Sequence, residues 1–321
     1  MPPSTVTPSP RALRSRLWLG VQLLFVALAL WYAGRALAGQ WSSVRLLAAR
    51  ASPRWGLVAA SALLVLASYA LLIQVWRAML TAWGEGGRLS YRDAARIWFV
   101  SNLTKYVPGK VWQIATMGVM AQGRGVSPVA AAGSSLIVNL ANIVSGFVVV
   151  LATGATVFRA FSDAGPRAGL LLAAILALGL LLLPAVLARA APYVARVTRQ
   201  RVTLPHIPAR AVWLAALGTA AAWALYGVAF QLFSASLVDG STGATTLYIA
   251  AFTGSYLVGY LALFAPGGLV VREGMLVASL TSLGLLTAPE AWLVAMASRL
   301  WLTALEVGPG LLFLLLRGDR L

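Results

Sequence analysis

The amino-acid sequence predicts an all-α, polytopic membrane protein with about six full transmembrane helices and a pair of broken, re-entrant helical hairpins. The 321 residues are 60% hydrophobic and only 10% charged, and their mean hydropathy is +0.84. This composition is too apolar for a chain that must cover its own surface in water. Apolar stretches recur along the whole length, and two of them are interrupted by proline and glycine.

The N-terminal segment 1–16 is rich in proline and arginine, which predicts a disordered, basic, cytoplasmic N-terminus. The apolar run after it resembles a signal peptide, but the following GRALAGQW offers only a weak cleavage site, so a retained first helix is favoured. We expect a single transmembrane domain over 17–316 and a cytoplasmic tail over 317–321.

Six segments are long enough to cross the bilayer, because a helix needs ~20 apolar residues to span a ~30 Å hydrocarbon core. The stretch 40–54 is amphipathic and is predicted to lie in the membrane interface. The predicted spans are 17–36, 55–79, 128–158, 167–188, 211–237 and 289–316.

Two further apolar regions, 93–122 and 244–284, are broken in the middle by YVPGKVW and FAPGGLV. Each arm of the first region is only ~20 Å long at ~1.5 Å per residue, so neither arm can span alone. If both regions are hairpins, most loop arginines, including those of 189–210, lie on the side of the N-terminus. If both cross, the arginines divide almost equally, so the positive-inside rule favours hairpins.

The hairpin arrangement gives the two halves of the chain, 55–158 and 211–316, opposite orientations. In each half the break is followed by a helix that begins near a proline, Pro128 or Pro289. Inverted repeats with broken helices near the bilayer midplane are typical of secondary transporters and related translocators. We therefore expect a multi-pass protein of the cell membrane with both termini cytoplasmic.

Charged residues at membrane depth are the best site candidates, because burying each costs at least ~2.5 to 3.5 kcal/mol. A half-helix that starts at a break presents backbone N–H groups and the positive end of its dipole, which together with nearby cations favours an anion such as a lipid phosphate. The alternative is that the breaks are kinks whose charges snorkel or pair internally. The charged residues are Lys105, Lys110, Arg272, Glu273, Arg299 and Glu306.

Arg272 and Glu273 are neighbours whose side chains point about 100° apart on a helix, so they are not expected to pair with each other. Arg299 is the expected partner of Glu273. Glu306 lies two turns after Arg299 on the same helical face.

Enzymatic, metal and nucleic-acid functions find no support in the sequence. It holds no cysteine, its lone histidine is His206 in a proline-flanked loop, and no nucleotide-binding or hydrolytic motif occurs. The net charge of +17 comes from arginines in short loops beside the spans, which sets membrane orientation. No cofactor and no nucleic acid are expected.

The segments SNLTKYVPGKVWQ (101–113), GVSPVAAAG (125–133), LFAPGGLVVREGMLVASLTSLG (263–284) and SRLWL (298–302) resemble the flippase-like membrane region of lysylphosphatidylglycerol synthases and its stand-alone relatives. The resemblance covers about 15–316. It implies a lipid translocator with inverted repeats around a cavity for lipid headgroups. The synthases carry a soluble aminoacyl-transfer domain after this region, and here the chain stops at Leu321, so synthase activity is not expected.

The first half of this chain is less charged than the same region in many relatives. Where many have an arginine shortly after the first proline-glycine, this sequence has Gln113 to Thr116, and where many have a Glu-Arg pair it has Val138 and Asn139. The resemblance implies a membrane lipid as ligand, either a phospholipid or a polyprenyl-phosphate-linked lipid. A separately encoded lipid-modifying enzyme is a candidate partner.

The leading hypothesis is translocation of an anionic or phosphate-bearing lipid through a midplane site between the hairpins. An ion-coupled transporter of a small anionic solute and a non-transporting scaffold for a membrane enzyme are the alternatives. Asparagines such as Asn139 and Asn142 either bridge helices or contact substrate. The predicted substrate-binding residues are Asn102, Lys105, Pro108, Gly109, Lys110, Gln113, Asn139, Pro266, Gly267, Gly268, Arg272, Glu273, Arg299 and Glu306.

Overall fold

In the computed structural model, the described residues form helices that are joined by short turns. These are 41–50, 52–85, 87–104, 112–154, 207–239, 243–262, 268 and 270–316, with isolated positions at 38 and between 171 and 189. The helices are α2 (Trp41–Arg50), α3 (Trp55–Leu80), the π-helical turn η1 (Thr81–Glu85), α4 (Tyr91–Leu103), α5 (Trp112–Gln122), α6 (Pro128–Thr153), α9 (Ala209–Leu237), α10 (Thr245–Leu261), α11 (Val271–Ser282) and α12 (Ala288–Leu315).

Four helices in the described part of the chain, α3 with η1, α6, α9 and α12, are long and apolar enough to cross a membrane. They coincide with four predicted spans, those at 55–79, 128–158, 211–237 and 289–316. The predicted spans 17–36 and 167–188 lie outside the described residues, apart from isolated positions in the second. The same holds for the terminal segments 1–16 and 317–321.

Local sequence signals account for where the helices begin. Pro128 and Pro289 each occupy the first turn of a helix, where the missing N–H of proline costs no hydrogen bond. The Glu290 carboxylate accepts hydrogen bonds from both the N–H and the hydroxyl of Thr287, at 2.9 and 2.7 Å, which closes the start of α12. Ser90 caps α4 by accepting from the N–H of Asp93.

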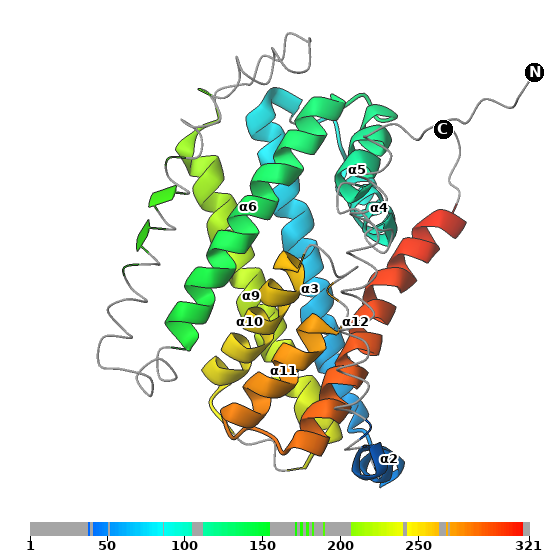
Figure 1. Ribbon diagram of the computed structural model, residues 1–321. Helices are drawn as coiled ribbons and strands as arrows, with labels where there is room; N and C mark the ends of the chain where they lie inside the picture. Colours follow the sequence, from blue (N-terminus) through cyan, green and yellow to red (C-terminus); the bar gives the residue numbers. More distant parts are fainter. Residues whose placement is uncertain are drawn as a thin grey trace, which may run out of the picture.

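Helices α4 and α5 form the first helix pair, and both of its outer ends lie at one end of the molecule (Figure 1). Arg124, just after α5, is 2.6 Å from the Asp93 carboxylate at the start of α4. The N–H of Ser127 donates to the Glu85 carboxylate at 3.2 Å. The chain therefore enters and leaves this pair at the same place, as a hairpin requires.

Helices α10 and α11 form the second helix pair, at the opposite end of the molecule (Figure 1). Its outer ends also meet, because a Cβ added to Gly243, before α10, would lie only 2.4 Å from the Leu285 side chain, after α11. The breaks that separate the arms of each pair, at 105–111 and 263–267, lie outside the described residues.

Each helix pair packs against one long helix of the other half of the chain. α4 packs against α12 and α10 packs against α6, while α3 lies along α9. Phe99 stacks on Phe313 at 6.1 Å between ring centroids, and Gly310 lets α12 approach this point of α4 closely. The order helix, helix pair, helix thus occurs twice, as α3, α4, α5, α6 and as α9, α10, α11, α12.

Helix α2 lies at the outer edge and packs against α12. Val44 faces inward and is buried, whereas Trp41 and Leu46 are exposed. The helix has the amphipathic character expected of the stretch 40–54, and its position in the membrane interface stays a prediction.

Candidate functional site

A cavity of about 210 Å³ lies in the middle of the molecule, where the helix pairs meet the long helices. Its walls are largely apolar and aromatic, with a few polar groups that converge on the space, which is the usual composition of a ligand site. Both pairs contribute polar side chains, Asn102 and Gln113 from the first and Arg272 from the second. α12 adds Arg299 and Glu306.

Arg272 is the dominant charge of the cavity wall. It is only 6% exposed, and its guanidinium carbon lies 5.0 Å from the centroid of the Tyr256 ring and 5.4 Å from that of Phe252. Nε and Nη2 have no hydrogen-bond partner among the described residues. The ring faces stabilise the cation in part, but the described residues do not satisfy its full hydrogen-bonding capacity.

Two glycines allow Arg272 to reach this position. A Cβ at Gly259 of α10 would lie 2.7 Å from the Cβ of Arg272, so a larger residue would push α11 away. Gly268 has a φ of +68°, and a Cβ there would lie 2.8 Å from the carbonyl oxygen of Gly259. Gly268 therefore allows the backbone before α11 to approach α10 closely.

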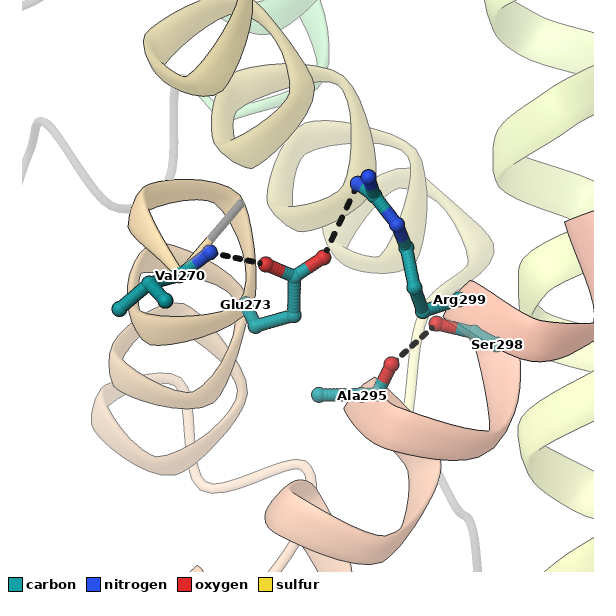
Figure 2. Close-up of polar contacts among 5 residues, drawn as sticks. All are labelled: Val270, Glu273, Ala295, Ser298 and Arg299. Atoms are coloured by element: carbon teal, nitrogen blue, oxygen red, sulfur yellow. Dashed lines mark hydrogen bonds and ion pairs between the residues drawn. The ribbon is translucent and has the colours of Figure 1, made fainter. Parts of the chain in front are cut away.

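Glu273 is not among the residues that line the cavity, and its carboxylate joins α11 to α12 (Figure 2). One carboxylate oxygen is 3.3 Å from Nη1 of Arg299, and the other accepts the N–H of Val270 at 2.8 Å. The Glu273–Arg299 pairing agrees with the sequence prediction. The Glu273 carboxylate therefore occupies part of the positive N-terminal end of α11, which was expected to face the ligand.

The backbone at the start of α11 is strained. Val270 has a φ of +71°, and a β-branched residue is rarely found in this left-handed region. Glu273 holds this conformation by accepting the Val270 N–H. Strain of this kind persists only where surrounding contacts enforce it, and it is common at functional sites.

Glu306 contributes a carboxylate to the cavity that also holds Arg272. It is 5% exposed and lies two turns after Arg299 on α12, so both side chains reach the cavity, as their spacing predicts. The second half of the chain therefore supplies all three charges that the described residues place on the cavity wall.

The first half supplies uncharged amides instead. Nε2 of Gln113 donates to Oδ1 of Asn102, which links α5 to α4. Asn139 and Asn142 reach the cavity from α6, and the carbonyl of Asn142 accepts the Trp223 indole N–H at 2.9 Å. Among the described residues, the first half therefore places no charge on the cavity wall, and Lys105 and Lys110 lie outside them.

The structure brings together most of the predicted site residues that it describes. Glu273 is the described candidate that does not line the cavity. Those predicted residues that lie outside the described part of the chain are Lys105, Pro108, Gly109, Lys110, Pro266 and Gly267. Those that line the cavity are Asn102, Gln113, Asn139, Gly268, Arg272, Arg299 and Glu306.

Sequence reasoning missed the aromatic residues of the cavity. Phe252, Tyr256 and Tyr260 all line it and recur every four residues on α10, a spacing that places them on one helical face. This stripe was available in the sequence, but aromatic residues at such spacing are also common in any helix core. Trp98 and Trp223 carry no comparable signal, because tertiary packing alone brings them to the cavity.

The fold and the cavity define a multi-pass helical membrane protein with a central, partly charged cavity. Residues 19–310 match the model of the lysylphosphatidylglycerol synthase TM region, and the chain belongs to this family. The resemblance seen in the sequence is therefore confirmed. The matched region is the membrane part of those synthases and not their catalytic domain, which indicates a membrane-embedded, lipid-related function. No curated protein matches the chain closely enough to count as a relative.

Proposed function

We propose that this protein translocates an anionic, phosphate-bearing lipid across the membrane through the central cavity. The observation that carries the proposal is Arg272, a buried cation on the cavity wall whose Nε and Nη2 have no hydrogen-bond partner among the described residues. A buried, incompletely paired charge is costly, and a phosphate oxygen would satisfy it with a charge-assisted hydrogen bond.

The shape of the cavity favours the headgroup of a lipid over the whole molecule. A space of about 210 Å³ is too small for acyl chains, so these would remain in the bilayer while the headgroup passes between the helix pairs. The aromatic and apolar lining suits the glycerol region of a lipid better than a strongly hydrated inorganic ion.

The proposed mechanism places α4–α5 and α10–α11 as re-entrant hairpins that enter the membrane from opposite faces. The repeated order of helix, helix pair and helix supports this arrangement, since inverted repeats provide alternating access by movement of one half against the other. In this arrangement both termini are cytoplasmic and the protein resides in the cell membrane. Two further spans, 17–36 and 167–188, complete the set of six.

The proposed activity is transport rather than catalysis. The chemistry that makes or modifies the lipid would then belong to a separately encoded enzyme, which is the partner that we propose. The cavity residues are suited to binding an anion, because the Arg272 guanidinium on the cavity wall presents a planar set of N–H donors that matches a phosphate.

Reconstitution tests the proposal. Purified protein in liposomes is expected to accelerate the exchange of fluorescent anionic phospholipids between leaflets, measured by quenching of the outer leaflet. Arg272→Gln is expected to reduce the rate at least tenfold, whereas Arg92→Gln, on an exposed residue of α4, should not change it. Rates equal to those of protein-free vesicles for several anionic lipids would exclude translocation, and binding of a small anion without lipid would favour a solute transporter.

A further inference from the structure

The polar residues of the cavity differ in chemistry between the two halves of the chain. The charges Arg272, Arg299 and Glu306 come from α11 and α12, in the second half of the chain. The helices of the first half, α4, α5 and α6, contribute carboxamides to the same space. They are Asn102, Gln113, Asn139 and Asn142.

A group of carboxamides recognises a particular kind of ligand. Each carboxamide has a donor and an acceptor side by side, and a hydroxyl group both donates and accepts, so neighbouring amides match neighbouring hydroxyls. Amides carry no charge, so they give no strong preference for a second phosphate or for an ammonium group. Four of them around one space therefore fit an uncharged, hydroxyl-rich group.

The amides are held in place and only partly used within the protein. Gln113 donates to Asn102, which fixes the two side chains against each other and leaves further donor and acceptor positions on both. Asn139 and Asn142 lie one turn apart on α6 and are only partly buried. The bond between the Trp223 indole and the backbone of Asn142 fixes this turn of α6 without using the Asn142 side chain.

Aromatic rings line the same cavity. Trp98 and Trp223 line the cavity together with Tyr69 and Tyr226. The flat ring faces can cover the C–H face of a polyol ring, while the amides bond its hydroxyls at the edge. A carboxylate headgroup gains nothing comparable from such surfaces, because the face of an aromatic ring carries partial negative charge.

We infer that the cavity selects a phosphodiester lipid whose headgroup beyond the phosphate is an uncharged polyol, such as a cyclitol or a sugar, with the phosphate at Arg272 and the hydroxyls at the amides of Asn102, Gln113, Asn139 and Asn142. The inference rests on the proposed lipid function, and it adds the class of headgroup.

Binding in detergent tests the inference without requiring transport. An equimolar mixture of phosphatidylinositol and phosphatidylserine is offered to the purified protein, and bound lipid is counted by native mass spectrometry. Both lipids carry a phosphodiester, so the ratio reports the rest of the headgroup. The wild type is expected to prefer phosphatidylinositol about three- to tenfold, the range that one or a few hydrogen bonds provide.

The variant Asn139→Leu/Asn142→Leu is expected to bring the ratio close to one, because it removes two amides at nearly constant volume. The matched control is Gln122→Leu, on an exposed amide at the end of α5 outside the cavity, which should keep the wild-type ratio. If the double variant does not fold, the ratio of phosphatidylinositol to phosphatidylserine bound by the wild type still tests the inference.

The outcomes separate this inference from the proposed function. Equal binding of both lipids by the wild type overturns polyol selection, even if both are translocated. A clear preference for phosphatidylinositol supports it, and if reconstituted protein then moves neither lipid, translocation fails while headgroup selection stands.

Discussion

The Glu273 carboxylate lies 3.3 Å from the Arg299 guanidinium and at the same time accepts the Val270 N–H at 2.8 Å (Figure 2). One side chain thus joins α11 to α12 and holds the strained start of α11. Because Arg272 immediately precedes Glu273, the position of the cavity cation depends on this joint. Glu273 is therefore a positioning residue that acts on the cavity through the backbone.

Glu273→Gln is expected to lower the free energy of unfolding by about 3 kcal/mol, because it removes the buried carboxylate that pairs with Arg299. The measurement is reversible unfolding in mixed micelles. Glu290→Gln is the matched control, since Glu290 also accepts the N–H of a helix start but lies at the protein surface, and it should cost less than about 1 kcal/mol. Equal losses for both variants would contradict the role assigned to the pair.

Two glycines of the second helix pair are expected to respond to alanine with opposite signs. Gly268→Ala places a Cβ 2.8 Å from the Gly259 carbonyl at a φ of +68°, so stability should fall by about 2 kcal/mol. Gly274→Ala meets nothing within 4 Å and lies inside α11, so stability should rise by about 0.5 to 1 kcal/mol. Thermal unfolding in detergent measures both, and a loss for Gly274→Ala as large as that for Gly268→Ala would argue against this geometry.

The long helices were predictable because membrane spans are encoded locally. A long run of apolar residues, such as those that begin at Pro128 and Pro289, forms a helix in lipid, because a helix satisfies the backbone N–H and C=O groups by hydrogen bonds within the segment. The paired helices were also predictable, since proline-glycine breaks and loop arginines are visible without any knowledge of tertiary contacts. Re-entry of the pairs from opposite faces of the membrane stays a prediction, and cysteine labelling tests it.

The cavity was predictable only through its charges. Placing a charged side chain at membrane depth costs free energy, so Arg272 and Glu306 could be identified as site candidates from this cost alone. The aromatic walls carry no such cost, because Trp223 in a membrane helix looks like any other core residue. Gly259 was missed for a related reason, since its importance comes from Arg272 of a different helix, which no local pattern encodes.

Cysteine labelling is expected to place the two helix pairs on opposite sides of the membrane, and the sequence contains no cysteine that would give a background. Arg92→Cys and Gln122→Cys, at the outer ends of the first pair, should react with an impermeant maleimide only after cells are permeabilised. Asp239→Cys and Ser282→Cys, at the opposite end of the molecule, should react in intact cells. Labelling of Arg92→Cys and Gln122→Cys from different sides would mean that α4 and α5 cross the membrane together as one span.

Arg272→Met and Arg299→Met are expected to differ in their effect on stability, although both remove an arginine that lines the cavity. Arg272 lies on the Tyr256 and Phe252 rings, and two of its nitrogens have no hydrogen-bond partner among the described residues. An apolar replacement removes the cost of burying the charge, which is several kcal/mol. It also loses the two cation–π contacts, which contribute about 2 kcal/mol each. The free energy of unfolding should stay constant or rise by up to about 2 kcal/mol.

Arg299→Met instead leaves the Glu273 carboxylate without its partner and should cost about 3 kcal/mol. Added anionic lipid should raise the melting temperature of the wild type but not that of Arg272→Met, because the ligand then has lost its cation. A stable Arg272→Met protein that lipid still stabilises would show that the phosphate binds elsewhere. A strongly destabilised one would mean that Arg272 serves the fold and not the ligand.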